Sequence, residues 1–232
     1  MALAAAPAAA EPAGSVTGTV RLVGARPTAR PATPVTTDAA VCGTTAPDES
    51  LVVSPAGGVR DAVVVLHVPG PVPATPRAPA VVDNVGCRFV PRVQLLVRGQ
   101  ALEVRTSDPI LHNTHAVLVA DPEVTMANLA LARPGQHMDL SRRLAAALPA
   151  SGEAIVRLRC DVHPWMTGWL VVSDHPWGAV SDGEGRFTIR DVPPGRYALD
   201  VWHERLGRTE RSVVVAPGGP ATVDVDLEAP MP

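Results

Sequence analysis

Residues 160–166 read Cys160-Asp-Val-His163-Pro-Trp-Met166, and this stretch decides how the middle of the chain is interpreted. In the segment before it, Val156 and Leu158 alternate with arginines, a period-two pattern typical of a strand with one buried face. Cys160 continues the buried face. The apolar run at 169–172 predicts a second strand directly after the loop. The sequence therefore predicts a strand–loop–strand unit with Cys160 at the end of its first strand, facing the core.

The side chains of this loop point to metal chemistry. Taken singly, a Cys or a Met is more often a buried core residue, but here a thiolate, an imidazole and a thioether lie within seven residues. Soft sulfur ligands favour Cu(I), and two His and one Cys with a weak axial Met form the blue-copper electron-transfer site. A second imidazole is available about fifty residues upstream in His112-Asn113-Thr-His115. These two histidines are three residues apart, so on a strand they face opposite sides and only one reaches the metal.

The loop resembles the ligand loop of cupredoxins of the amicyanin and plastocyanin-like type, in which the Cys-x2-His-x2-Met spacing is short. The upstream His-Asn-x-His motif is also similar to that family, where its first His is a ligand. The resemblance covers about 84–174. It implies that Asn113 joins the two ligand loops by hydrogen bonds and that His115 lies outside the site. The implied copper ligands are His112, Cys160, His163 and Met166.

Two further residue types in the loop have expected roles. Pro164 lacks a backbone N–H and fixes one backbone dihedral beside His163, so we expect it to limit hydrogen bonding near the thiolate and to stiffen the loop. Trp165 and Trp169 either shield the copper or form the docking face for a redox partner, or they are ordinary packing aromatics. The sequence leaves both interpretations open.

A second pattern lies towards the C-terminus, at residues 181–189 and 192–197, where Gly, Pro and Asp mark successive hairpin turns. It resembles the carboxypeptidase regulatory-like, transthyretin-like β-sandwich. The two strands that precede this pattern in that family match Val16–Val20 and Asp61–Leu66, more than a hundred residues upstream. The resemblance implies that a cupredoxin domain at 81–174 interrupts a sandwich built from 15–70 and 175–229. The alternative is two sequential domains in which the N-terminal strands complete the cupredoxin.

The fold class follows from short β-like segments separated by Gly, Pro and Asp turns. They predict an all-β protein, with a Greek-key cupredoxin sandwich plus a second small β-sandwich. Residues 24–50 and 69–80, rich in Pro, Thr and Ala, are expected to be long loops, and 140–147 a helical turn. The expected strands include 18–23, 61–68, 93–97, 102–105, 186–189, 197–202, 212–215 and 222–227.

Composition narrows the function classes. The chain has 232 residues, a net charge of −3 and 46% apolar residues, enough for one large or two small domains. Its basic residues are all arginines and form no basic run, which argues against a nucleic-acid partner. No apolar stretch approaches the ~20 residues of a membrane helix, so we expect no integral membrane segment. Residues 1–14 are expected to be a disordered tail or a truncated signal peptide.

The remaining cysteines and histidines have open or minor roles. Cys42 and Cys87 flank strand-like segments and either pair in an oxidising compartment or stay as free thiols. A single Cys in the ligand loop argues against a binuclear copper centre. His175 and His203 have no Cys or paired His at ligand spacing, so we expect surface or interdomain histidines.

The resemblance implies a type 1 (blue) copper protein that carries one electron at a time between extracytoplasmic partners, in the periplasm or secreted. A cytochrome c or a dehydrogenase would dock transiently over an exposed edge of His163, as such interfaces are small. An enzyme is disfavoured because four protein ligands leave no open coordination position. The alternative is a copper-binding or structural interaction module, for copper delivery or partner docking, without electron transfer.

Overall fold

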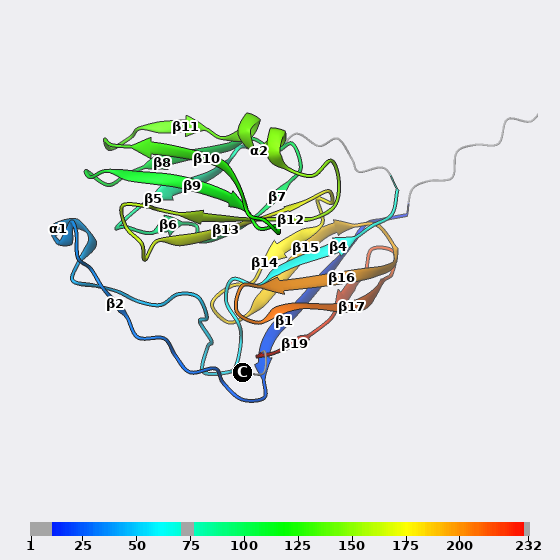
Figure 1. The fold of residues 1–232 in the computed structure, drawn as a ribbon. Helices are drawn as coiled ribbons and strands as arrows, with labels where there is room; N and C mark the ends of the chain where they lie inside the picture. The colour runs from blue at the N-terminus through cyan, green and yellow to red at the C-terminus, as the bar shows by residue number, and fades with distance from the viewer. Residues whose placement is uncertain (1–10, 71–76, 230–232) are drawn as a thin grey trace, which may run out of the picture.

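The computed structural model describes residues 11–70 and 77–229 and consists almost entirely of β-strands, as the sequence predicts (Figure 1). Most of the expected tail, residues 1–10, and the middle of the expected loop at 69–80 lie outside the described residues. Among the helices described, none combines the length and apolar character needed to cross a membrane. The strands form two separate packed units.

The first unit contains the Cys160 segment and packs a five-stranded sheet, in the order β10-β9-β12-β13-β7, against a four-stranded sheet, in the order β11-β8-β5-β6. Helix α2 (Ser141–Ala147) lies against β10 and buries Leu144, which agrees with the expected helical turn. The strands of this unit are β5 (Ala80–Asn84), β6 (Phe89–Val90), β7 (Val93–Val97), β8 (Leu102–Thr106), β9 (His112–Leu118), β10 (Val124–Leu131), β11 (His137–Asp139), β12 (Ala154–Arg159) and β13 (Thr167–Ser173).

The core of this unit follows from side-chain alternation. Along β12, Val156 and Leu158 are buried while the arginines between them stay partly exposed, which is the predicted pattern. Burying one face of each sheet against the other removes their apolar side chains from water and is the main driving force for this packing. Cys160 and Met166 belong to the same buried cluster as these residues, so the ligand loop closes one end of the core.

The second unit takes strands from both ends of the chain. One sheet has the order β15-β1-β18, with β19 also paired to β1, and the other has the order β14-β4-β16-β17. We propose from this pairing that the sandwich is discontinuous, with the first unit inserted into it. Its strands are β1 (Gly14–Val23), β4 (Val63–His67), β14 (Gly178–Val180), β15 (Arg186–Val192), β16 (Gly195–His203), β17 (Gly207–Val215), β18 (Pro220–Thr222) and β19 (Val225–Glu228).

The prediction of one continuous strand at 222–227 is wrong. The structure divides it into β18 and β19, which pair with successive parts of β1. At the break, Asp224 still faces outward but binds β1 with its side chain, accepting hydrogen bonds from the Thr19 backbone N–H at 2.9 Å and the Arg21 guanidinium at 2.9 Å. At this position a side chain replaces the backbone hydrogen bonds between the strands, and the alternation of residue types does not indicate that.

The two units meet through a small apolar cluster. Val63 and Val65 of β4 pack with Val93 of β7 and Val171 of β13. At its margin Trp169 contacts Trp202 edge-on, with ring centroids 5.4 Å apart. Trp169 therefore packs between the units.

A long excursion from the second unit reaches the far end of the first (Figure 1). After β1 the chain runs through β2 (Thr33–Pro34), the single-turn helix α1 (Ala39–Cys42) and β3 (Thr45–Ala46) before it returns to β4. The expected long loop at 24–50 thus contains a two-residue ladder and one helical turn. A disulfide from Cys42 to Cys87 attaches it to the first unit, with a Cα–Cα distance of 5.2 Å. Residues 38–43 are called the cap below.

Candidate metal centre

Three of the predicted ligands converge at one end of the first unit. His112 begins β9, Cys160 follows β12 directly, and His163 lies in the loop before β13; β9 and β12 are neighbouring antiparallel strands. The Nδ1 atoms of His112 and His163 are 3.0 Å apart, and Cys160 Sγ is 3.6 Å from His163 Nδ1. One ligand atom from each residue lies within 4.8 Å of the others, and all three side chains are buried.

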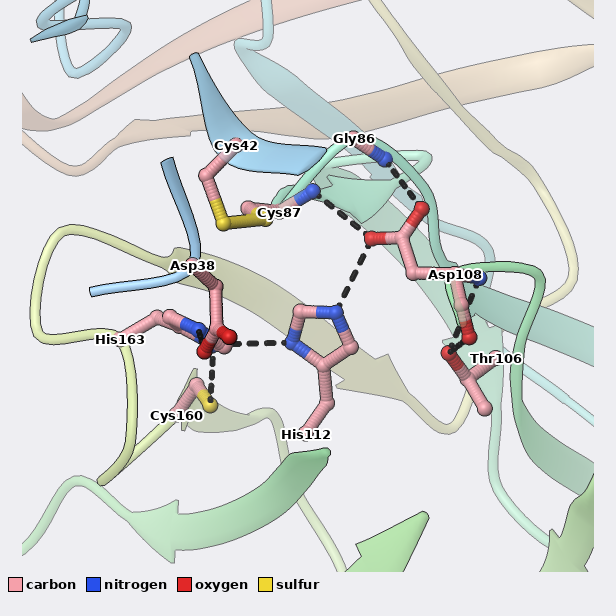
Figure 2. The surroundings of a disulfide bond; sticks show 9 residues. All are labelled: Asp38, Cys42, Gly86, Cys87, Thr106, Asp108, His112, Cys160 and His163. Atoms are coloured by element: carbon pink, nitrogen blue, oxygen red, sulfur yellow. Dashed lines mark hydrogen bonds and ion pairs between the residues drawn. A yellow bond between two sulfur atoms is a disulfide. The ribbon is translucent and has the colours of Figure 1, made fainter. Parts of the chain in front are cut away.

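Each imidazole turns its other nitrogen to a carboxylate (Figure 2). His112 Nε2 lies 2.9 Å from Asp108 Oδ2, and His163 Nε2 lies 3.1 Å from Asp38 Oδ2. A carboxylate only accepts, so each ring donates its Nε2–H, and a neutral ring then carries a lone pair on Nδ1. Histidines that bind metals almost always donate their second N–H in this way, which sets the tautomer and the ring orientation.

This arrangement tests whether a metal fits. Two lone pairs that face each other at 3.0 Å repel unless a proton or a metal ion lies between them. A metal bound at about 2.0–2.1 Å to nitrogen and about 2.3 Å to sulfur has its ligand atoms about 3.3–3.8 Å apart. The Nδ1–Nδ1 distance would need to lengthen by a few tenths of an ångström to reach those values, and the Sγ–Nδ1 distance of 3.6 Å already lies within them. The residues fit a metal ion, and a thiolate with two imidazoles is a donor set that suits copper.

The protonation state of His112 also suits a ligand. Burial lowers the pKa of His112 below its ordinary value, although the hydrogen bond to Asp108 acts in the opposite direction. Neutral imidazole is the form that binds metals. Asp108 is itself held by backbone N–H groups, at 2.8 Å from Gly86 and 2.9 Å from Cys87, so the carboxylate that orients His112 has a fixed position.

Met166 returns to the site through a tight turn. Its backbone N–H donates to the His163 carbonyl at 2.9 Å, and the Cys160 N–H points to the Met166 carbonyl at 3.4 Å. The side chain is buried in the cluster that contains Cys160. The turn keeps the three loop residues together before any metal binds, and the axial role of Met166 remains a prediction.

Asn113 makes the hydrogen bonds that link the two ligand segments. Its backbone N–H points to Cys160 Sγ at 3.5 Å, and its side-chain oxygen accepts from the Asp161 N–H at 2.7 Å. The side-chain amide donates to Asp161 Oδ2 at 2.9 Å. Asn113 therefore holds the segment that begins with His112 against the segment that contains Cys160.

His115 faces away from these ligands. Its Nδ1 is 3.0 Å from Asp161 Oδ1 and its Nε2 is 3.1 Å from Thr125 Oγ1. The hydrogen bond with His115 is the largest cause that lowers the pKa of Asp161. The choice of His112 over His115 therefore has support from the direction of the two side chains, as strand alternation predicts.

The expected docking over an exposed edge of His163 is wrong. His163 is 0% exposed, because Asp38 covers its Nε2 edge and the disulfide of the cap lies beside it, with sulfur atoms within 4.8 Å of a His163 ring nitrogen (Figure 2). The cause is a contact between residues 125 positions apart, for which the sequence carries no local signal. Asp38 and Asp108 are the site residues that sequence reasoning missed.

The outer surface of the loop is formed by Pro164 and Trp165. Pro164 is exposed, and Trp165 is half-buried with its ring centroid 5.2 Å from that of His163. Trp165 also lines a cavity of about 350 Å³ together with Met166 and several arginines. One part of the Trp165 ring thus covers His163, and the rest of the ring is exposed to solvent. The stiffening role of Pro164 stays a prediction.

For His203 and His175 the sequence left a surface and an interdomain position open. His203 is buried, and its burial, followed by the charge of Arg92, lowers its pKa to about 4. Its proximity to Arg92 of the first unit makes it an interdomain residue and not a surface one. His175 lies beside His67, with ring centroids 5.3 Å apart. This neighbour comes from a strand more than a hundred residues upstream, so spacing along the sequence does not indicate it.

Comparison with known proteins gives one family match and several structural similarities. The family model for the carboxypeptidase regulatory-like domain matches residues 170–228, about a quarter of the chain. The sequence matches none of the curated proteins compared with it. The matched region contains the hairpin pattern that suggested this family.

Among solved structures, a reduced amicyanin variant is 19% identical, covering 47% of this chain and 98% of its own, with a TM-score of 0.32. A purple cupredoxin from Nitrosopumilus maritimus is 17% identical over 40% of this chain and 99% of its own, with a TM-score of 0.31. A copper-containing nitrite reductase from Thermus scotoductus SA-01 is 21% identical over 45% of this chain, with a TM-score of 0.30. The chain spans 24% of that reductase. The protein is therefore similar to the carboxypeptidase regulatory-like domain over residues 170–228. Its similarity to the solved cupredoxin structures is weak.

Proposed function

We propose that the protein binds one copper ion through His112, Cys160 and His163, with Met166 as the axial ligand, and carries single electrons between extracytoplasmic redox partners. The observation that carries this proposal is the pair of Nδ1 atoms that face each other at 3.0 Å beside a buried cysteine sulfur. Both outer nitrogens are on carboxylates, so the inner ones are the nitrogens available to a metal.

The chain's own residues would keep the centre rigid. When bound, copper supplies a one-electron couple between Cu(I) and Cu(II). Asp108 and Asp38 hold the two imidazole rings, and Asn113 directs an N–H at the thiolate. The apolar core around Cys160 and Met166 excludes water. Four ligands held in place leave no open position for a substrate, which supports a carrier over an enzyme.

Partner contact is proposed at the Pro164–Trp165 surface, since the cap covers the edge of His163. Trp165 is the partly exposed ring packed against His163, so it offers the shortest protein path to a ligand from that face. A cytochrome c or a dehydrogenase are suitable partner classes. The Cys42–Cys87 disulfide supports a periplasmic or secreted protein, because structural disulfides persist in oxidising compartments.

A copper-binding module without electron transfer is the second candidate, and the cap is the observation that favours it. A segment that covers a ligand histidine slows exchange of both electrons and metal. A module for copper delivery would release Cu(I) readily once the cap opens. A carrier would instead retain copper through repeated oxidation and reduction.

The first experiment is the visible absorption and electron paramagnetic resonance spectrum of copper(II)-loaded protein beside the variants Cys160→Ala and His112→Ala. We expect an intense thiolate-to-copper band in the wild type that both variants lose. His115→Ala is the matched control, because this histidine faces away from the site, and it should keep the band. A colourless wild type, or a band that persists without Cys160, would exclude the proposed centre. Voltammetry then separates the two candidates, because only a carrier shows a reversible one-electron wave.

A further inference from the structure

A second group of metal-ligating side chains lies where the two units meet, away from Cys160. His67 ends β4 and Asp200 lies on β16, two residues beyond the direct cross-strand partner of His67 and so on the same face of the sheet. Glu153 precedes β12 of the first unit, and His175 lies in the connection from β13 to β14. His67 Nε2 is 3.1 Å from Asp200 Oδ2 and 3.8 Å from Glu153 Oε1.

Two buried atoms of this group have no hydrogen-bond partner among the described residues, namely Glu153 Oε1 and His175 Nδ1. The Glu153 side chain is only 10% exposed, and a buried polar atom without a partner is unfavourable. A carboxylate oxygen and an imidazole nitrogen are both metal ligands.

The separations among His67, Glu153 and Asp200 are close to those of tetrahedral coordination, whereas His175 lies beside the His67 ring and outside that group of mutually close ligand atoms. Zinc bound at about 2.0–2.2 Å to nitrogen and oxygen has ligand atoms about 3.3 Å apart. The 3.1 and 3.8 Å distances around His67 Nε2 lie on either side of that value. Two imidazoles and two carboxylates, with no sulfur, form a set that suits Zn²⁺ better than Cu(I).

Arg208 offers the competing explanation. Its guanidinium lies 2.6 Å from Glu153 Oε2 and 3.1 Å from Asp200 Oδ2, so the group is in part an ion-pair network. Arg208 binds the outer oxygen of Glu153 and leaves Oε1 directed at His67. Its side chain is 42% exposed, so it is free to move away when a cation enters. A metal site and an ion-pair network predict opposite effects of removing this arginine.

We propose that His67, Glu153 and Asp200 form a binding site for one Zn²⁺ that joins the two units, with the neighbouring His175 as the fourth ligand after a side-chain movement. The first unit contributes Glu153, the second contributes His67 and Asp200, and His175 comes from the connection between them. A metal bound there stabilises only the docked arrangement, because the ligands separate when the units part. This proposal does not depend on copper binding at Cys160.

The test is calorimetric titration of Zn²⁺ into the Cys160→Ala protein, which lacks the thiolate. We expect one zinc ion per chain and a rise in melting temperature. His67→Ala and the isosteric Glu153→Gln should each weaken binding at least tenfold, whereas His137→Ala, an exposed histidine elsewhere, should not change it. The visible spectrum of the Co²⁺ form should show tetrahedral coordination without a sulfur band.

Arg208→Gln decides between the two explanations. A metal site predicts that zinc binds as tightly or more tightly once this competing cation is removed. An ion-pair network predicts a lower melting temperature that zinc does not restore. Absence of stoichiometric zinc binding, or binding that survives both His67→Ala and Glu153→Gln, would also overturn the proposal.

Discussion

Removal of the Cys42–Cys87 disulfide, by the double variant Cys42→Ala and Cys87→Ala, is expected to weaken the fold and to open the metal centre. The bond joins residues 45 positions apart. For a loop of that length, the chain-entropy relation gives about 4 kcal/mol of stabilisation at 25 °C through restriction of the unfolded chain. We therefore expect the free energy of unfolding to fall by about 2–4 kcal/mol.

The same variant should expose His163. Helix α1 has four residues and buries none of them, so little packing holds the cap once the disulfide is gone. The remaining contacts are partial packing of Val41 on the core and the pair of Asp38 with His163 Nε2. Asp38 is partly exposed, and ion pairs contribute little there. Segments with few buried contacts open locally at low free energy. We expect faster hydrogen exchange in residues 160–166 and faster loss of copper(I) to a chelator.

The assay combines urea unfolding of the metal-free protein with hydrogen exchange of the loop peptides. Wild-type protein treated with a dithiol reductant is the matched control, because it lacks the same bond without any substitution. A loss of stability below about 1 kcal/mol would contradict the entropy argument. Unchanged exchange in residues 160–166 would refute the assignment of 38–43 as a cap held by the disulfide.

Three further outcomes follow from the structure. Asp38→Asn removes the negative charge that accepts the hydrogen bond from His163 Nε2. We expect the affinity for copper(II) to fall about 10–100-fold and the reduction potential of the copper to rise. An unchanged potential in voltammetry would exclude a role for Asp38 in tuning the metal through His163. Met166→Leu conserves volume, so stability should change by less than about 1.5 kcal/mol, while the potential changes if the thioether is the axial ligand. His203 has a pKa of about 4 in the fold against 6.5 ordinarily. The unfolded chain therefore binds the extra proton, and stability, complete above pH 6.5, should fall by about 3 kcal/mol as the pH drops to 4; His203→Gln should flatten that dependence in urea unfolding.

The sequence by itself determined the features that depend on near neighbours. Alternation along β12 predicted which side chains face the core, and burial of Val156 and Leu158 follows it. Cys160, His163 and Met166 lie within one turn of chain, so their proximity needs no tertiary information. Turn residues between short apolar segments were enough to predict the all-β class, although β5, β9 and β10 were among the strands missed. In β9 the polar start, His112 to Thr114, hides a strand whose residues are nearly all buried.

Only the tertiary structure decided what surrounds those ligands. Asp38 reaches His163 from 125 residues away, and Asp200 reaches His67 from 133 residues away. Such contacts depend on how the sheets pack and on where the disulfide-bonded segment between β1 and β4 lies. Neither leaves a periodic pattern in the sequence. The break between β18 and β19 is of the same kind, since it depends on side-chain pairing with β1. Local periodicity encodes which face of a strand is buried, whereas the partner of that face is chosen by long-range packing.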